Sequence, residues 1–160
     1  MYTLSEAVPV NRDRAADDPE LTTEQVWKGL LDKADNALPY VPHMTSCTVL
    51  ETYPDGLLRD VVYRGEPARE RITFTPGRRV QFVRTGGTTR GTILNELEDD
   101  DGDLVLRFTF SLEKEGLAPD SDEEREHFSL VEKDYRASVH ATLAAIRRVA
   151  REASASSATG

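Results

Sequence analysis

From Ser46 to Leu112, hydrophobic residues recur at every second position, and short groups of turn-favouring residues interrupt the pattern. A period of two is typical of β-strands that bury one face. Because every interruption is short, neighbouring strands must be antiparallel and joined by hairpins. The sequence therefore predicts six consecutive strands, at residues 46–53, 57–64, 69–75, 79–85, 88–98 and 103–112.

The segment before these strands predicts one more strand and a helix. Residues 1–11 contain β-forming residues separated by polar ones, which favours a first strand. Thr22 and Gln25 have the spacing of a capping box, the side-chain pattern that opens many helices. Val26 and Leu30 then begin an apolar stripe at helical spacing, so we expect a helix from this point.

Two prolines restrict the chain after this helix. Asn36 and Pro39 are expected to end it, because the residue before a proline avoids the helical conformation. The stretch 38–44 contains both Pro39 and Pro42, so it has room only for a brief second helical turn. Two short helices are thus expected between the first and second strands.

The longest predicted element is a helix near the C-terminus. Ser121 and Glu124 repeat the capping-box pattern, with further acidic residues in the first turn. Apolar residues then recur every three or four positions for about eight turns, which indicates one continuous apolar face. Its members are Phe128, Val131, Tyr135, Val139, Leu143, Ile146 and Val149.

This order of elements predicts an α+β fold. One curved sheet must cover its inner face, and the C-terminal helix is the element long enough to do so. We expect the sheet to wrap around this helix and to leave an apolar cavity between them. The chain has 160 residues, which suits one domain over residues 1–153, followed by a disordered tail at 154–160.

The last predicted strand decides which side chains face the cavity. Alternate positions in it are large and apolar, so these side chains must face inward. Residues paired directly across a hairpin face the same side of the sheet, so the inward positions of the other strands follow from those of the last strand. The aromatic and aliphatic wall of the cavity is then expected to include Trp27, Phe74, Phe82, Phe108, Phe110, Tyr135, Val139 and Leu143.

Several polar residues fall on the same inner face, and two interpretations of them remain open. They are either ion pairs at strand ends that reach solvent, or groups that orient a ligand in a partly wet cavity. The expected register pairs Glu51 with Arg59 and puts Tyr63, Glu70 and Arg84 in one row. We expect Glu51 and Arg84 to be surface residues, and for the rest both interpretations stay open: Arg59, Tyr63, Glu70 and Asn95.

If the protein is an enzyme, the simplest chemistry needs no cofactor. Glu70 would act as a base at a carbon acidified by a carbonyl, and Tyr63, Asn95 or Arg59 would stabilise the enolate oxygen. Such a Glu70 needs a raised pKa. Cyclisation, dehydration or isomerisation of a polyketide-like substrate fits this site. The alternatives are a carrier or sensor of a hydrophobic metabolite, and an interaction protein whose core is filled.

Charge and composition exclude several other classes. The net charge of −9 disfavours nucleic acid and anionic membranes as partners. Cys47 is the only cysteine, so neither a disulfide framework nor a thiolate zinc site is available. The three histidines have no metal-ligand spacing, although His43 is a candidate for gating the cavity. The acidic run 98–103 is expected to be a solvated hairpin tip rather than a cation site.

The N-terminal segment lacks the apolar core of a signal peptide, and no stretch approaches the roughly 20 apolar residues of a membrane span. We therefore expect a cytoplasmic protein, either a monomer or a homodimer, whose partner is a hydrophobic small molecule.

Short motifs along the chain resemble those of the AtaL-like family, within the START-like, helix-grip superfamily that is also called SRPBCC. The resemblance covers about Tyr2 to Arg151, and its most specific piece is QVWKGL at residues 25–30. Weaker matches are Val10-Asn11, Leu21-Thr22, Val41-Pro42, Cys47, Arg59-Asp60-Val61, Glu70-Arg71-Ile72, Asn95 and Leu106 to Phe110.

This resemblance implies a seven-stranded sheet that grips the long helix around a deep apolar pocket. Members of the superfamily bind lipids, hormones or plant metabolites, and some are polyketide cyclases or aromatases. The AtaL-like branch is associated with secondary-metabolite gene clusters and implies no agreed catalytic residues.

Overall fold

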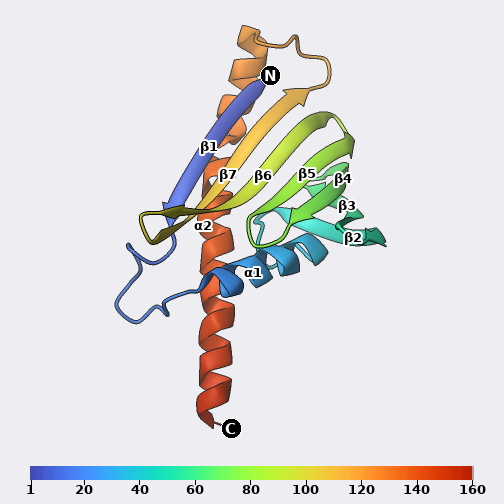
Figure 1. Cartoon of the computed structure of the whole chain (residues 1–160). Helices are drawn as coiled ribbons and strands as arrows, with labels where there is room; N and C mark the ends of the chain where they lie inside the picture. Colours follow the sequence, from blue (N-terminus) through green and yellow to red (C-terminus); the bar gives the residue numbers. More distant parts are fainter. Residues whose placement is uncertain (160) are drawn as a thin grey trace.

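The computed structural model describes the backbone of residues 1–159 and the side chains of residues 1–155. Figure 1 shows one curved sheet, with the long C-terminal helix along its concave side and a shorter helix crossing near one end. The elements are β1 (Tyr2–Pro9), α1 (Thr23–Asp35), β2 (Met44–Tyr53), β3 (Gly56–Tyr63), β4 (Glu66–Thr75), β5 (Arg79–Gly86), β6 (Thr89–Asp100), β7 (Asp103–Lys114) and α2 (Asp122–Thr159).

The sheet has seven antiparallel strands in the order β1-β7-β6-β5-β4-β3-β2, so β1 and β2 form its edges. The predicted meander and its inward-facing alternation are confirmed, because each hairpin is short enough to fix the direction of the next strand. Apolar side chains from the concave face and from α2 form the core, including Phe108, Phe128 and Val139.

One of the two expected short helices is not formed as a helix. The backbone N–H groups of Tyr40 and Val41 both donate to the carbonyl of Ala37, at 2.9 Å each, and Met44 N–H donates to the carbonyl of Val41 at 3.4 Å. Pro39 and Pro42 lack N–H groups, so they cannot extend the ladder. The region between β1 and β2 therefore has one helix, α1, followed by two short hydrogen-bonded turns.

The capping box at the start of α1 is confirmed. Gln25 N–H donates to Thr22 Oγ1 at 3.2 Å, and Thr22 N–H donates to Gln25 Oε1 at 2.8 Å. At the start of α2 only half of the predicted box forms. Glu124 N–H donates to Ser121 Oγ, but the Glu124 carboxylate accepts from Asp120 N–H, one residue earlier than expected.

The register of the β3–β4 hairpin differs from the prediction. Arg64 and Gly65 both have positive φ, 50° and 80°, so they form a two-residue turn that pairs Tyr63 with Glu66. The expected longer turn would have paired Tyr63 with Glu70. The shift of four residues keeps every side chain on its predicted face, and it places Arg59 opposite Glu70.

Glu51 was expected opposite Arg59, and the structure places it elsewhere. A β-bulge between Val49 and Glu51 moves Glu51 opposite Leu58, while Val49 pairs with Arg59. Glu51 is exposed and accepts a hydrogen bond from the Tyr53 hydroxyl at 2.6 Å. Glu51 is therefore a surface residue, as expected from the sequence, but it does not pair with Arg59.

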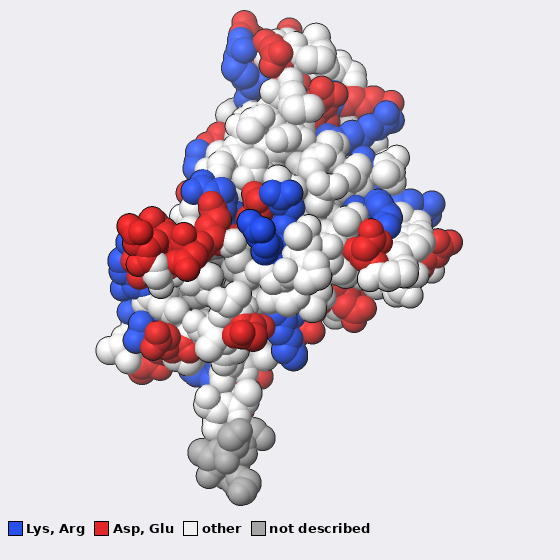
Figure 2. Space-filling view, viewed as in Figure 1, with Lys and Arg blue, Asp and Glu red and all other residues white. Residues whose placement is uncertain are grey.

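Charged side chains of both signs cover the outer surface, and acidic ones gather at the tip of the β6–β7 hairpin, at the left of Figure 2. This tip is a tight turn in which Asp100 pairs with Asp103 and Gly102 N–H donates to Asp99 Oδ1 at 2.7 Å. Within the described part of the chain, no helix is both long and apolar enough to cross a membrane.

Helix α2 runs on through residues 154–159, where the composition led us to expect a disordered tail, and Gly160 lies outside the described residues. Helix α1 packs against α2 at Gly29, where an added Cβ would lie 2.4 Å from Cγ1 of Ile146. This close approach brings the last turn of α1 to the open side of the sheet, where it contributes to the candidate functional site.

Candidate functional site

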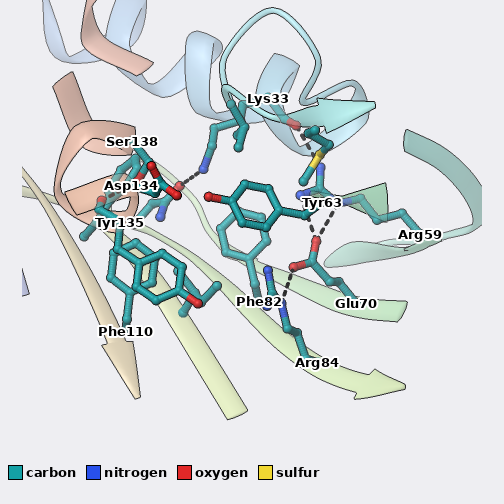
Figure 3. A pocket seen from close by; sticks show the side chains of 15 residues that line it. Lys33, Arg59, Tyr63, Glu70, Phe82, Arg84, Phe110, Asp134, Tyr135 and Ser138 are labelled. Atoms are coloured by element: carbon teal, nitrogen blue, oxygen red, sulfur yellow. Dashed lines mark hydrogen bonds and ion pairs between the residues drawn. The ribbon is translucent and has the colours of Figure 1, made fainter. Parts of the chain in front are cut away.

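A hollow of about 60 Å³ lies between the concave face of the sheet, the end of α1 and the middle of α2. Figure 3 shows side chains from all three elements converging on it. The lining consists of apolar and aromatic walls with an unusual number of charged groups. Its members are Lys33, Val41, Met44, Arg59, Tyr63, Glu70, Phe82, Arg84, Ile93, Asn95, Phe108, Phe110, Asp134, Tyr135 and Ser138.

One wall of the hollow is a buried network of two arginines around one carboxylate. Arg59 Nε donates to Glu70 Oε1 at 2.9 Å, and Arg84 Nε donates to Glu70 Oε2 at 3.2 Å. The side chains are 3%, 2% and 10% exposed for Arg59, Glu70 and Arg84. Buried charges are tolerated only when they are paired and hydrogen-bonded, and the register of β3, β4 and β5 supplies the pairing.

Arg59 also connects the sheet to α1. Its Nη1 donates to the backbone carbonyls of Lys33 and Ala34, at 2.9 Å each. These carbonyls belong to the last turn of α1, where backbone acceptors have no partner within the helix and a positive charge is favourable. A single guanidinium thus holds the end of α1 against β3 and β4.

The pKa of Glu70 is set by these neighbours. Burial alone would raise the pKa of this carboxyl, but the guanidiniums of Arg59 and Arg84 outweigh it and hold the pKa below its ordinary value. Glu70 is therefore a stable carboxylate. The raised pKa that a general base would need is not what this geometry produces.

Lys33 is the most unusual group in the hollow, and the sequence analysis did not single it out. The residue is 5% exposed, and its Nζ donates to Asn95 Oδ1 at 2.6 Å. The same Nζ lies 4.8 Å from the ring centroid of Phe82 and 4.6 Å from that of Phe108. Burial, with a smaller contribution from the charge of Arg59, lowers the pKa of Lys33 to about 7.

Asn95, in the wall of the hollow, has a buried side-chain donor without a partner in the described part of the chain. Its side chain is fully buried, and its Oδ1 is occupied by Lys33. Its Nδ2 has no hydrogen-bond partner among the described residues. An unpaired buried amide donor costs roughly 1–3 kcal/mol, so a ligand or water that accepts from Nδ2 would stabilise the site.

The rim of the hollow is formed by Tyr63, the turn that precedes β2, and α2. Arg64 Nε donates to Asp134 Oδ2 at 2.7 Å, and the same carboxylate lies 3.9 Å from His43 Nε2. His43 has a φ of 70°, and its ring stands edge-on to that of Tyr63 at 6.5 Å. Burial raises the pKa of the Tyr63 hydroxyl, which stays protonated and available as a donor.

A second hollow, of about 200 Å³, lies on the other side of this rim. Tyr63, Arg84 and Tyr135 line both hollows. The second hollow is completed by residues near the starts of α2, β4 and β6, among them Glu66, Thr89 and His127. The three shared side chains lie between the two spaces.

The structure brings together all four residues proposed for catalysis: Arg59, Tyr63, Glu70 and Asn95 line the same hollow. Four of the eight residues proposed for ligand binding also line it, namely Phe82, Phe108, Phe110 and Tyr135.

The other four proposed ligand-binding residues lie outside this lining. Trp27 and Phe74 pack edge-to-face with ring centroids 6.3 Å apart. Val139 and Leu143 belong to the buried core beneath α2.

Sequence reasoning missed Lys33 and misjudged Arg84. Lys33 lies seven residues after Val26 and three after Leu30, on the apolar stripe of the helix, and a lysine there is a signal for an unusual buried amine. Arg84 was expected at the surface, but its pairing with Glu70 across β4 and β5 carries it inside.

The architecture defines a class of protein: a curved antiparallel sheet around a long C-terminal helix, with a hollow between them, is a helix-grip fold. The family model described as acetylaranotin biosynthesis cluster protein L, AtaL, matches residues 4–153, and the chain belongs to this family. No match is found among curated protein sequences.

Solved structures share the fold at low sequence identity. The ZhuI aromatase/cyclase from Streptomyces sp. R1128 is 19% identical with a TM-score of 0.64, over 92% of this chain and 95% of that one. The di-domain ARO/CYC StfQ from the steffimycin biosynthetic pathway is 12% identical with a TM-score of 0.69, over 96% of this chain and 52% of StfQ. Ara h 8.0201 is 16% identical with a TM-score of 0.60, over 91% and 97%.

Proposed function

We propose that this protein binds an apolar or aromatic small molecule, of a polyketide-like or lipid-like kind, in the hollow beneath its sheet. The observation that carries the proposal is the concentration of buried polar groups around an internal space, with the unpaired Nδ2 of Asn95 among them. A core that served folding alone would gain from apolar residues at these positions. Membership of the AtaL family and the fold shared with aromatase/cyclases add support.

The size of the hollow determines how such a ligand enters. Sites for drug-sized molecules measure roughly 300–1,000 Å³. The hollow of about 60 Å³ is smaller, so a ligand of this size requires the rim to move. Opening at Tyr63 would add the neighbouring space of about 200 Å³. The apolar part of the ligand would then lie along Phe110 and Tyr135, with its polar end near Lys33 and Asn95.

Two functions are compatible with this binding site. In the first, the protein converts its ligand without a cofactor, by cyclisation, dehydration or isomerisation, and Arg59, Tyr63 and Asn95 donate to a developing enolate oxygen. In the second, it is a carrier or sensor that releases its ligand unchanged. The lowered pKa of Glu70 favours the second function over any mechanism in which Glu70 is the base.

Native mass spectrometry of freshly purified protein tests the binding, because a retained ligand adds a defined mass. Ser138 lines the hollow, and its Oγ donates to the carbonyl of Tyr135 at 2.7 Å. Replacement by a larger side chain, Ser138→Met, should fill the space and remove the added mass. Ser129 has the same helical hydrogen bond, to Glu126, but is exposed. Ser129→Met is therefore the matched control and should retain the ligand.

The recovered ligand separates the two functions. Incubation with the wild-type protein, followed by liquid chromatography with mass spectrometry, should give a dehydrated or isomeric product if the protein is an enzyme. Recovery of the ligand unchanged supports the carrier. If neither the wild type nor the control variant retains any small molecule, and no aromatic compound in a screen binds in a Ser138-dependent manner, the binding proposal is wrong.

A further inference from the structure

We propose that Lys33 is a nucleophilic amine that forms a reversible imine with an aldehyde or ketone group of the bound molecule. Asn95 is the donor that holds the carbonyl oxygen. This inference deepens the proposed function and rests on it, because it names the ligand class as a carbonyl compound and requires that the ligand reach the hollow.

The first argument is the position of two complementary groups. The Nζ of Lys33 and the side chain of Asn95 both line the hollow, and they are joined by a 2.6 Å hydrogen bond through Asn95 Oδ1. The Nδ2 on the same amide has no partner among the described residues. A carbonyl oxygen that accepts from Nδ2 would place its carbon beside Nζ, because the amide fixes the two positions relative to each other. The rings of Phe82 and Phe108 keep water from the amine.

The second argument is the protonation state of the amine. Only a neutral amine attacks a carbonyl, and desolvation lowers the pKa of Lys33 to about 7, so the uncharged amine is well populated at neutral pH. Arg59 lowers this pKa further, whereas Glu70 raises it, and Arg84, Tyr63 and Asp134 also line the hollow.

The other lysines of the chain lack this environment. The hydrogen bond and charge of Asp32 raise the pKa of Lys28 on the same helix. Lys114 is bound to Glu66 at 3.2 Å, and Lys133 is exposed. Lys33 is thus the one buried lysine among the four lysines of the sequence.

The step balances without any further reactant. The lone pair of Nζ attacks the carbonyl carbon, and the electrons of the carbonyl π bond move to the oxygen, where Asn95 Nδ2 donates. A proton passes from nitrogen to this oxygen and gives a carbinolamine. The nitrogen lone pair then forms the C=N bond as the C–O bond breaks, and the hydroxyl leaves as water with the remaining N–H proton. One carbonyl and one amine give one imine and one water.

Such an imine would suit both candidate functions. Once protonated, it withdraws electrons from the adjacent carbon, so that carbon loses a proton more readily and becomes a nucleophile for ring closure. A carrier would use the same bond to retain its ligand. The inference therefore applies to either function and is tested by the covalent bond itself.

The probe is acetylacetone, a compact diketone whose adduct with an amine loses water and is stabilised as a conjugated enaminone. The wild-type protein is incubated with it at a series of pH values, and the adduct is located by peptide mapping. We expect modification at Lys33, a rate that increases with a midpoint near pH 7, and a new near-ultraviolet absorption band. Lys28→Met should react as the wild type does, and Lys33→Met should give no adduct.

Adducts distributed over Lys28, Lys114 and Lys133 with Lys33 unmodified would overturn the inference, and so would the absence of any adduct. Peptide mapping of the wild type shows which lysine carries the adduct, so the test holds even if the Lys33→Met variant fails to fold. The Ser138→Met experiment distinguishes a failure of the proposed ligand binding from a failure of the imine proposal. Ser138-dependent ligand binding with an unreactive Lys33 refutes the imine alone, whereas a reactive Lys33 in a protein that binds no larger ligand refutes the binding proposal alone.

Discussion

Replacement of Lys33 by methionine should make the folded state more stable below neutral pH and remove part of its pH dependence. In the unfolded chain the lysine has its ordinary pKa of 10.5, and in the folded protein the pKa is about 7. Between these values the unfolded chain holds a proton that the folded protein lacks, so the stability of the wild type rises with pH across this window. At lower pH both states are protonated, and the penalty for burying the ammonium is present in full.

The magnitude comes from the size of the shift. A pKa unit corresponds to about 1.4 kcal/mol, so the shift from 10.5 to about 7 corresponds to about 5 kcal/mol. Methionine fills a similar volume without a charge, but it leaves Asn95 Oδ1 without its donor, which costs about 1–3 kcal/mol. Below pH 7 the Lys33→Met variant should therefore be more stable than the wild type by about 2–4 kcal/mol. This advantage should fall by about 5 kcal/mol as the pH approaches 10.5.

Urea unfolding at several pH values measures this difference, because groups that titrate equally in both proteins cancel. Lys28→Met is the control: Lys28 is exposed and forms an i,i+4 pair with Asp32, so its loss should change the stability by less than about 1 kcal/mol at every pH. A difference between the Lys33→Met variant and the wild type that stays constant from about pH 6 to about pH 10 would refute the reasoning, because the amine would then titrate as it does in water.

Three further predictions concern stability. Glu70→Gln leaves two buried guanidiniums without their carboxylate and should destabilise the fold by about 3–5 kcal/mol in urea unfolding, whereas Glu96→Gln, at a more exposed pair, should cost less than about 1 kcal/mol. Because the pKa of Glu70 is lowered on folding, its contribution is present above the ordinary value of 4.5 and is lost as the pH falls through the folded pKa; an acid titration in which the wild type and Glu70→Gln lose stability in parallel would contradict this. Gly91→Ala should prevent stable folding, as judged by circular dichroism, since φ is 133° and the new Cβ would lie 2.1 Å from the carbonyl oxygen of Ser111; a cooperative native-like unfolding transition is the contrary result. Thr22→Ala removes the side-chain acceptor of the α1 capping box and should lower the free energy of unfolding by about 1 kcal/mol.

The parts of the fold that depend on local pattern could be predicted from the sequence. The alternation of apolar residues specifies which side chains enter the core, and a shift by an even number of residues does not alter the face. This is why Tyr63, Glu70 and Asn95 were expected on the inner face and lie there. The expected pairing of Glu70 with Arg84 is confirmed, whereas the expected pairing of Tyr63 with Glu70 was wrong. The Thr22–Gln25 capping box is equally local, since both bonds join residues three apart.

The parts that depend on exact pairing could not be predicted. The two-residue turn at Arg64 and Gly65 requires positive φ at a non-glycine residue, which the sequence does not indicate. The position of Arg59 opposite Glu70 depends on that register, and the lowered pKa of Glu70 depends on the charge of Arg59 together with that of Arg84. Lys33 becomes a buried amine only because the end of α1 is held against the sheet, a contact between segments far apart in the sequence.

The bond between Arg59 and the last carbonyls of α1 couples two regions that would otherwise respond to a ligand independently. A molecule that displaces the Glu70 network has to move a guanidinium that also anchors the helix end. The chain continues from that end through the turn at Ala37 to His43, whose ring stands edge-on to that of Tyr63 at the rim. Binding of a ligand in the hollow would therefore be transmitted through a few residues of backbone to the rim. The event that binds the ligand would also change the position of the rim residues around it.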